Sequence, residues 1–210
     1  MIYHSRMINK EQLIRQVGQL FLNGSEASIA DQYASSWARA NLLRTNHPLA
    51  TTDELCQIAA KKYLAQVAAI GGGAGAIAAA PFFGTLATIG SAAGDIFLVG
   101  KTSVNHVLLL AALHDLILDE PQLRRLTVLS SLAAQPTPRP LELTSSSFVE
   151  NLNRKLAERV IIKVGAKLLP VRASAALPML VGAAAAASLN AKFATQISTN
   201  ALAVIKLQAI

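Results

Sequence analysis

The chain has 210 residues, of which 52% are apolar and 15% are charged. This length suits one domain with a sizeable core. The single cysteine, Cys56, excludes an intramolecular disulfide and a cysteine-based metal cluster, and its apolar neighbours predict an inert buried thiol.

The net charge is +7, and all of the excess lies in one part of the chain. Residues 151–210 carry eight basic side chains and one acidic one, whereas residues 1–150 carry eleven of each. This asymmetry predicts a basic face for an anionic partner, either a lipid surface or a nucleic acid. The first residues lack the apolar segment of a secretory signal, so we expect a cytoplasmic location, peripheral to or partly inserted in the inner membrane.

Helical patterns begin near the N-terminus. Asn9 and Gln12 resemble a capping box, which opens a helix that we expect to stop near Gly24. A second helix is predicted over residues 28–44, where an Asn-His-Pro sequence follows it.

The longest uncharged run of the chain, residues 63–94, follows a third predicted helix. Thr51 and Glu54 form the capping box of that helix. The run exceeds the roughly 20 residues that a membrane-spanning helix needs. However, more than half of it is Gly or Ala, and the glycines at 71–75 and Pro81 divide it. We therefore expect two short, closely packed helices, buried in protein or placed against lipid.

The second half of the chain continues the helical pattern. A long apolar helix is predicted over residues 98–118, and a short one opens at Pro121. Residues 135–140 read as a stiff, extended linker. Ser147 caps a helix that we expect to end near Pro170, and a further helix follows Pro178.

These elements predict an all-α fold, an Ala/Gly-rich helical bundle with long apolar central helices. Signals for β-hairpins and period-two alternation are absent from the sequence. The expected organisation comprises an N-terminal helical region (1–50), a Gly/Ala-rich apolar core (51–134), a Pro-rich linker (135–146) and basic, Ala-rich C-terminal helices that pack on the core (147–210).

Two segments of the chain partly match nucleotide-binding motifs, but neither has the full set of features that its motif requires. Residues 73–78 fit a dinucleotide fingerprint with Asp95 at a suitable distance, yet a capped helix stands where the required strand should precede. Residues 94–102 resemble a phosphate-binding loop, but five residues separate its glycines instead of four, and three of them are bulky and apolar. Neither motif predicts a cofactor, and we expect none.

Polar residues inside apolar segments are the other candidates for function. Asp95 and Lys101 are isolated charges that either face water or serve a function, since burying a charge is costly. His106 and Asn190 are further buried polar candidates. His106, His114, Asp115 and Asp119 lack the spacing of a metal site, and we expect them to mark a helix end.

The clearest surface pattern lies in residues 152–168. Apolar residues recur every four positions from Leu152 to Leu168, and basic residues run beside them with the same spacing. Such a helix fits either an anionic bilayer surface or an ordinary solvated flank. The basic segment lacks the aromatic residues of nucleic-acid stacking platforms, so no nucleic-acid partner is expected. The predicted lipid contacts are Lys155, Arg159, Lys163, Lys167, Phe82 and Phe83.

Several stretches of residues 50–205 resemble the EcsC protein family. They include Ala59–Tyr63, the glycines at 71–73, Pro81 and Asp95, the Leu118–Arg124 segment, and Leu177–Ala183 followed by Asn190. His114 and Asp115 stand where that family usually has a Tyr-Gly-like pair. The resemblance implies a helical bacterial protein that is named for an ABC-transporter operon and has no established enzymatic activity.

The leading hypothesis is thus a non-enzymatic, membrane-associated helical protein that contacts anionic lipid and, through the resemblance, a membrane transporter. One alternative is a soluble carrier of lipid or apolar ligands with a tunnel lined by Phe82, Phe83, Phe97 and Leu98. Another is a helical toxin whose apolar hairpin inserts into bilayers. An enzyme that uses Asp95, Lys101 and His106 is the last.

Overall fold

The structure, a computed structural model, describes residues 10–72, 92–135, 146–175 and 179–209, with side chains omitted at 71–72, 92–93, 169–175 and 179–186. Every regular element in these ranges is helical, which confirms the predicted all-α class. The helices are α1 (Lys10–Ile29), α2 (Tyr33–Asn46), α3 (Thr52–Gly72), α4 (Ala92–Leu113), α5 (Pro121–Ala133), α6 (Ser146–Ala175) and α7 (Met179–Gln208).

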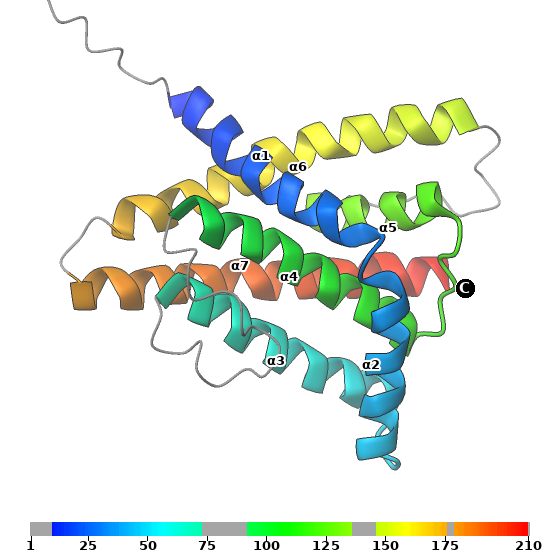
Figure 1. The fold of residues 1–210 in the computed structure, drawn as a ribbon. Coiled ribbons are helices and arrows are strands. Elements are labelled where there is room, and N and C mark those ends of the chain that lie inside the picture. Colours follow the sequence, from blue (N-terminus) through cyan, green and yellow to red (C-terminus); the bar gives the residue numbers. More distant parts are fainter. Residues whose placement is uncertain (1–9, 73–91, 136–145, 176–178, 210) are drawn as a thin grey trace, which may run out of the picture.

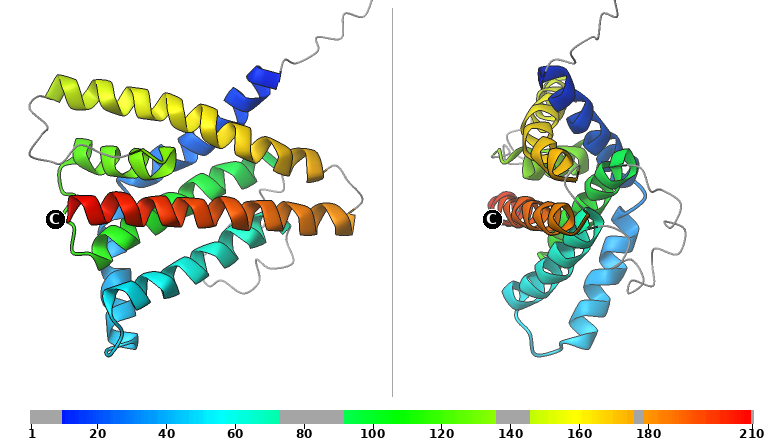
Figure 2. Two further views of the ribbon diagram at one scale, coloured as in Figure 1. Left: turned by 180° about the vertical axis from the view of Figure 1, so that it is seen from behind. Right: turned by 90° about the vertical axis from the view of Figure 1, so that its left-hand side faces the viewer.

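The helices form a layered bundle with α4 and α7 in its middle (Figure 1). α6 runs along one edge and α3 along the opposite edge, and both further views show the same order (Figure 2). α1 packs against α4 and α6, α3 against α4 and α7, and α5 against α6 and α7. The buried apolar side chains of all seven helices join one cluster, so the expected N-terminal, central and C-terminal regions share a core.

Polar side chains define several helix ends as the sequence predicts. The Thr51 amide donates to Glu54 Oε2 (2.8 Å), and the Glu54 amide donates back to Thr51 Oγ1 (3.3 Å), which is the predicted capping box. Pro121 opens α5 as expected, and Glu120 caps this helix by accepting from the Leu123 amide (2.6 Å).

The predicted C-terminal ends of α1 and α6 are wrong. α1 does not stop near Gly24 but continues to Ile29. Gly24 lies inside α1, where its lack of a side chain allows close contact with α4. α6 runs through Pro170 to Ala175. A proline inside a helix removes one N–H donor, and the thirty-residue α6 retains its helical course on both sides of that position.

The predicted central helix is also displaced. α4 starts at Ala92, six residues before the expected position, and ends at Leu113 instead of residue 118. Asp115 follows in the left-handed region (φ 53°), which turns the chain away from the helix axis. Residues 94–102, which resembled a phosphate-binding loop, lie within α4, so their backbone conformation is that of a helix and not of a phosphate-binding loop. The predicted break at Gly71–Gly75 agrees with the end of α3, while Pro81 and the linker after Gln135 lie outside the described residues.

Glycines allow α1 to approach two helices at backbone contact. A Cβ atom added to Gly18 would lie 1.9 Å from the carbonyl oxygen of Ile161 in α6, and one added to Gly24 would lie 2.0 Å from that of Phe97 in α4. Gly165 and Gly100 stand in the same relation to α1 from the other side. Close helix packing through small residues was predicted for residues 63–94, most of which lie outside the described residues. Among the described residues, such packing occurs at these four glycines.

Candidate functional site

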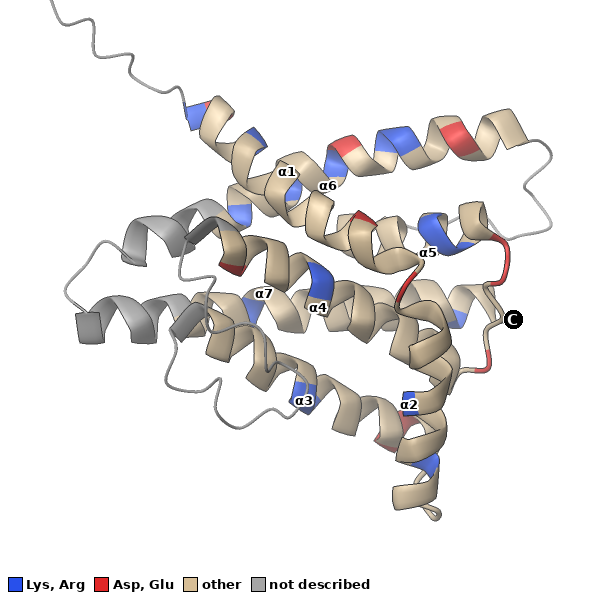
Figure 3. Ribbon diagram, in the orientation of Figure 1, with Lys and Arg blue, Asp and Glu red and all other residues tan. Residues whose placement is uncertain are grey.

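The apolar stripe of α6 faces the protein interior. Leu156, Val160, Val164 and Leu168 are buried, and Leu152 packs against the core from a half-buried position. This stripe therefore packs against the other helices of the bundle and does not face a bilayer. What α6 presents to solvent is its basic flank, along which blue segments recur in Figure 3.

Three basic side chains of α6 have neutral partners. Arg159 donates to the side-chain oxygen of Gln135 (2.7 Å), and Lys163 donates to the carbonyl of Ala133 at the end of α5 (2.9 Å). Lys167 donates to the side-chain oxygen of Gln196. Its pKa is lowered by partial burial and then by the neighbouring charge of Lys163. Because carbonyl and amide acceptors carry no net charge, these contacts orient the cations without neutralising them.

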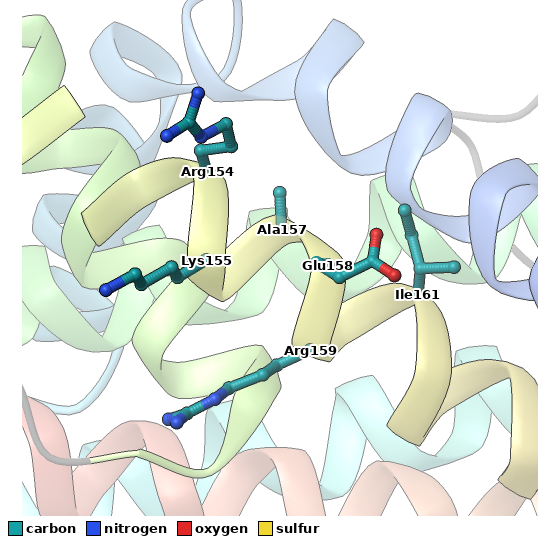
Figure 4. Close-up of a pocket in the computed structure, with 6 residues that line it drawn as sticks. All are labelled: Arg154, Lys155, Ala157, Glu158, Arg159 and Ile161. Atoms are coloured by element: carbon teal, nitrogen blue, oxygen red, sulfur yellow. The ribbon is translucent and has the colours of Figure 1, made fainter. Parts of the chain in front are cut away.

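A surface hollow of about 580 Å³ lies over the middle of α6. Lys155 and Arg159 extend to one side of the helix and Arg154 points in another direction, while Glu158 points away from Lys155 and Arg159 (Figure 4). Ala157 and Ile161 provide apolar surface. Glu158 is paired with Arg15 of α1 (2.6 Å). The only carboxylate that lines the hollow is thus paired with Arg15. The three cations therefore give the hollow a positive charge.

Two exposed apolar side chains share the outer face of α6 with these cations. Phe148 is 48% exposed and Ile162 is 44% exposed. They lie seven residues before and seven residues after Lys155, and seven residues correspond to about two helical turns. All three therefore lie within a narrow strip along the helix. The sequence analysis missed Phe148 and Ile162, although the seven-residue spacing around Lys155 was a signal for them.

The predicted buried candidate His106 lies in a polar cluster between α3, α4 and α7. Its Nε2 is hydrogen-bonded to Ser198 Oγ (2.9 Å), and its ring stacks on Tyr63 with centroids 4.2 Å apart. The Tyr63 hydroxyl donates to Ser103 Oγ (2.8 Å), since the hydroxyl proton of Ser103 goes to the Val99 carbonyl (2.7 Å). Burial, and to a smaller extent the charge of Arg39, lowers the pKa of His106 to about 3. The imidazole is therefore neutral at physiological pH.

The other predicted polar candidates, Asn190, Lys101 and Asp95, lie outside this cluster. Asn190 is buried and donates to the carbonyl of Val67 (3.2 Å). Lys101 is exposed to solvent, and Asp95 is half-buried and engaged in an interaction. Asp95 and His106 are eleven residues apart on one helix, which corresponds to about 16 Å. α4 thus does not bring Asp95, Lys101 and His106 together.

A second hollow, of about 440 Å³, lies where α3 begins and α4 and α7 end. Lys206 pairs there with Asp53 (2.8 Å), and His114 Nε2 lies 3.7 Å from the sulfur of the buried Cys56. Burial raises the pKa of this thiol to about 11, which leaves it protonated and unreactive. No group of three potential metal-ligating side chains occurs among the described residues.

One helix of the described chain, Gly94–Leu113, is long and apolar enough to cross a membrane by length and composition alone. Within the bundle, 72% of its most apolar stretch is buried, as in the central helix of a soluble protein. Its apolar character therefore has a sufficient explanation in the core.

The predicted contacts Phe82 and Phe83 lie outside the described residues, as does most of the run between α3 and α4. No protein-family model, curated protein or solved structure matches the chain. The resemblance to the EcsC family therefore stays a prediction.

Proposed function

We propose that this chain is a non-enzymatic, EcsC-like protein that associates peripherally with anionic membranes through the outer face of α6. The observation that carries this proposal is a set of four exposed cations, Lys155, Arg159, Lys163 and Lys167. The last three donate to neutral acceptors. Each Lys or Arg near an anionic lipid surface contributes about 1 kcal/mol to binding. Association with a membrane transporter belongs to the same proposal and rests on the family resemblance alone.

The position of α6 supports a peripheral mode. The helix runs along an edge of the bundle, where a flat surface can approach it (Figure 2). Its apolar stripe stays in the core, so contact does not require the bundle to open. This differs from an interfacial amphipathic helix, which buries its own apolar face in lipid.

The test is vesicle co-sedimentation of the full chain at low salt. The variant to compare is Lys155→Gln with Arg159→Gln, since Lys163 caps α5 and its loss would disturb the fold. At about 1 kcal/mol per charge, affinity for anionic vesicles should fall roughly 30-fold. The matched control, Lys61→Gln with Lys62→Gln, removes two exposed charges from α3 and should bind like the parent.

Salt and competing polyanions complete this experiment. Binding of the parent should weaken as salt rises, because exposed charges are screened within about 10 Å at 0.1 M. Absence of binding to anionic vesicles at low salt overturns the proposal. Tighter binding to duplex DNA than to vesicles under the same conditions also overturns it.

The inserting helical protein remains a second candidate because of α4. Its length and composition permit a membrane span. Insertion would have to remove α4 from its contacts with α1, α2, α3 and α7. Dye release from loaded vesicles distinguishes the two functions: a peripheral protein leaves the dye enclosed, whereas an inserted hairpin that forms a pore releases it.

A further inference from the structure

We infer that Phe148 and Ile162 insert into the interfacial layer of the membrane while the cations between them bind lipid headgroups. This inference rests on the proposed membrane association and specifies how the same face would act. The partner of this face is a lipid bilayer, which supplies both an anionic headgroup layer and an apolar layer beneath it.

The register of α6 places these groups on one line. Phe148, Lys155 and Ile162 follow one another at intervals of seven residues, and each interval rotates the position by only about 20°. Phe148 and Ile162 are therefore about 21 Å apart along one face. Arg159 lies one turn after Lys155 on the same side and is exposed.

The exposure of the two apolar side chains agrees with this assignment. Both leave nearly half of their surface in water, although Leu156, Val160, Val164 and Leu168 of the same helix are buried. Phe and Ile gain free energy when this surface leaves water. A duplex nucleic acid offers phosphates to the cations but no apolar layer for these two residues, which favours lipid as the partner.

The charge around them determines which bilayer is bound. Glu158, the acidic residue of α6 that is nearest in sequence to Lys155 and Arg159, forms an ion pair with Arg15. An anionic bilayer thus attracts the face and a neutral bilayer does not. Binding should combine a salt-sensitive electrostatic part with an apolar part that salt does not screen.

The experiment compares the full chain with Phe148→Ser/Ile162→Ser on anionic vesicles. Loss of two apolar contacts should weaken binding roughly tenfold or more at physiological salt. The matched control is Leu42→Ser/Leu49→Ser, which removes two exposed leucines from α2 and the loop that follows it. This control should bind like the parent. The thermal unfolding of both variants, measured beside the parent, distinguishes lost binding from lost folding.

A fluorophore at position 162 reports insertion directly. Ile162→Cys can be labelled selectively, since the only other cysteine, Cys56, is buried. A polarity-sensitive label there should shift to shorter wavelength on anionic vesicles, whereas the same label on Leu49→Cys should not. If the parent binds but the Ser variants bind equally and the label does not shift, insertion is wrong and the electrostatic proposal stands. If the parent does not bind, both are wrong.

Discussion

Gly18 of α1 and Gly165 of α6 mark a crossing at which each helix touches the backbone of the other. A Cβ atom at Gly18 would lie 1.9 Å from the Ile161 carbonyl oxygen, and one at Gly165 would lie 1.9 Å from the Ile14 carbonyl oxygen. The relation is reciprocal, so neither helix can accept a side chain without moving the other. The position of α6, and with it the basic face, depends on this crossing.

Gly18→Ala should therefore destabilise the protein although alanine is the better helix former. The propensity gain is about 1 kcal/mol, whereas backbone overlap at this distance forces the helices apart and costs roughly 1–3 kcal/mol or more. We expect a net loss in the free energy of unfolding measured by urea denaturation. Gln16→Ala, on an exposed position of the same helix, serves as control. Equal or higher stability of Gly18→Ala would contradict the close crossing.

Arg44 holds the C-terminal end of α4 in place. Its Nη2 lies 3.2 Å from the carbonyl oxygens of Ala112 and Leu113 and 2.9 Å from Asp115 Oδ1. Arg44→Met retains the apolar stem but leaves these carbonyls without the donor, which should cost about 1.5–3 kcal/mol in thermal or urea unfolding. Asp115→Asn removes only an exposed ion pair and should cost less than about 1 kcal/mol. A larger loss for Asp115→Asn than for Arg44→Met would show that the ion pair dominates.

His106 should make stability depend on pH in a defined window. Burial, followed by the charge of Arg39, lowers the pKa of His106 from 6.5 to about 3. Between these values the unfolded chain binds a proton that the folded chain does not, so stability is lost as the pH falls below 6.5. His106→Gln removes this proton uptake. From pH 7.5 to 5 the parent should lose roughly 2 kcal/mol more than the variant, as measured by urea unfolding at each pH. Parallel pH profiles would contradict a buried neutral imidazole.

Cys56 should react slowly with thiol reagents in the folded protein. Burial raises the pKa of this thiol to about 11, and the neighbouring His114 does not offset that effect. At pH 8 we expect slow disulfide exchange with an aromatic disulfide reagent and rapid exchange after unfolding in urea. Comparable rates in both states would indicate an activated thiol–imidazole pair.

The sequence alone predicted the helical class and several helix ends, because these depend on local chemistry. The Thr51–Glu54 box and Pro121 act within a single turn, and both are found as predicted. Gly24 was misread as a helix end because its role comes from Phe97, a residue distant in sequence. Long-range contact of this kind leaves no local signal.

The same distinction applies to the surface of α6. The four-residue spacing identified both the apolar stripe and the basic flank, but not which of them faces outward. Packing of α1 and α5 on α6 decides that question, and it buries Val160 while leaving Ile162 exposed. Of the four polar candidates, His106 and Asn190 are buried, Asp95 is half-buried and Lys101 is exposed. The partners Ser198 and Val67 come from other helices and leave no local signal.

The bonds from Lys163 to the end of α5 and from Lys167 to Gln196 have a consequence for recognition. A lysine in solution samples many rotamers, and fixing it in a complex costs up to about 2 kcal/mol of side-chain entropy. Here that freedom is restricted in the unbound protein, by acceptors that leave the ammonium charge intact. An anion that binds these two cations therefore costs them less side-chain entropy than it would cost two unbonded lysines.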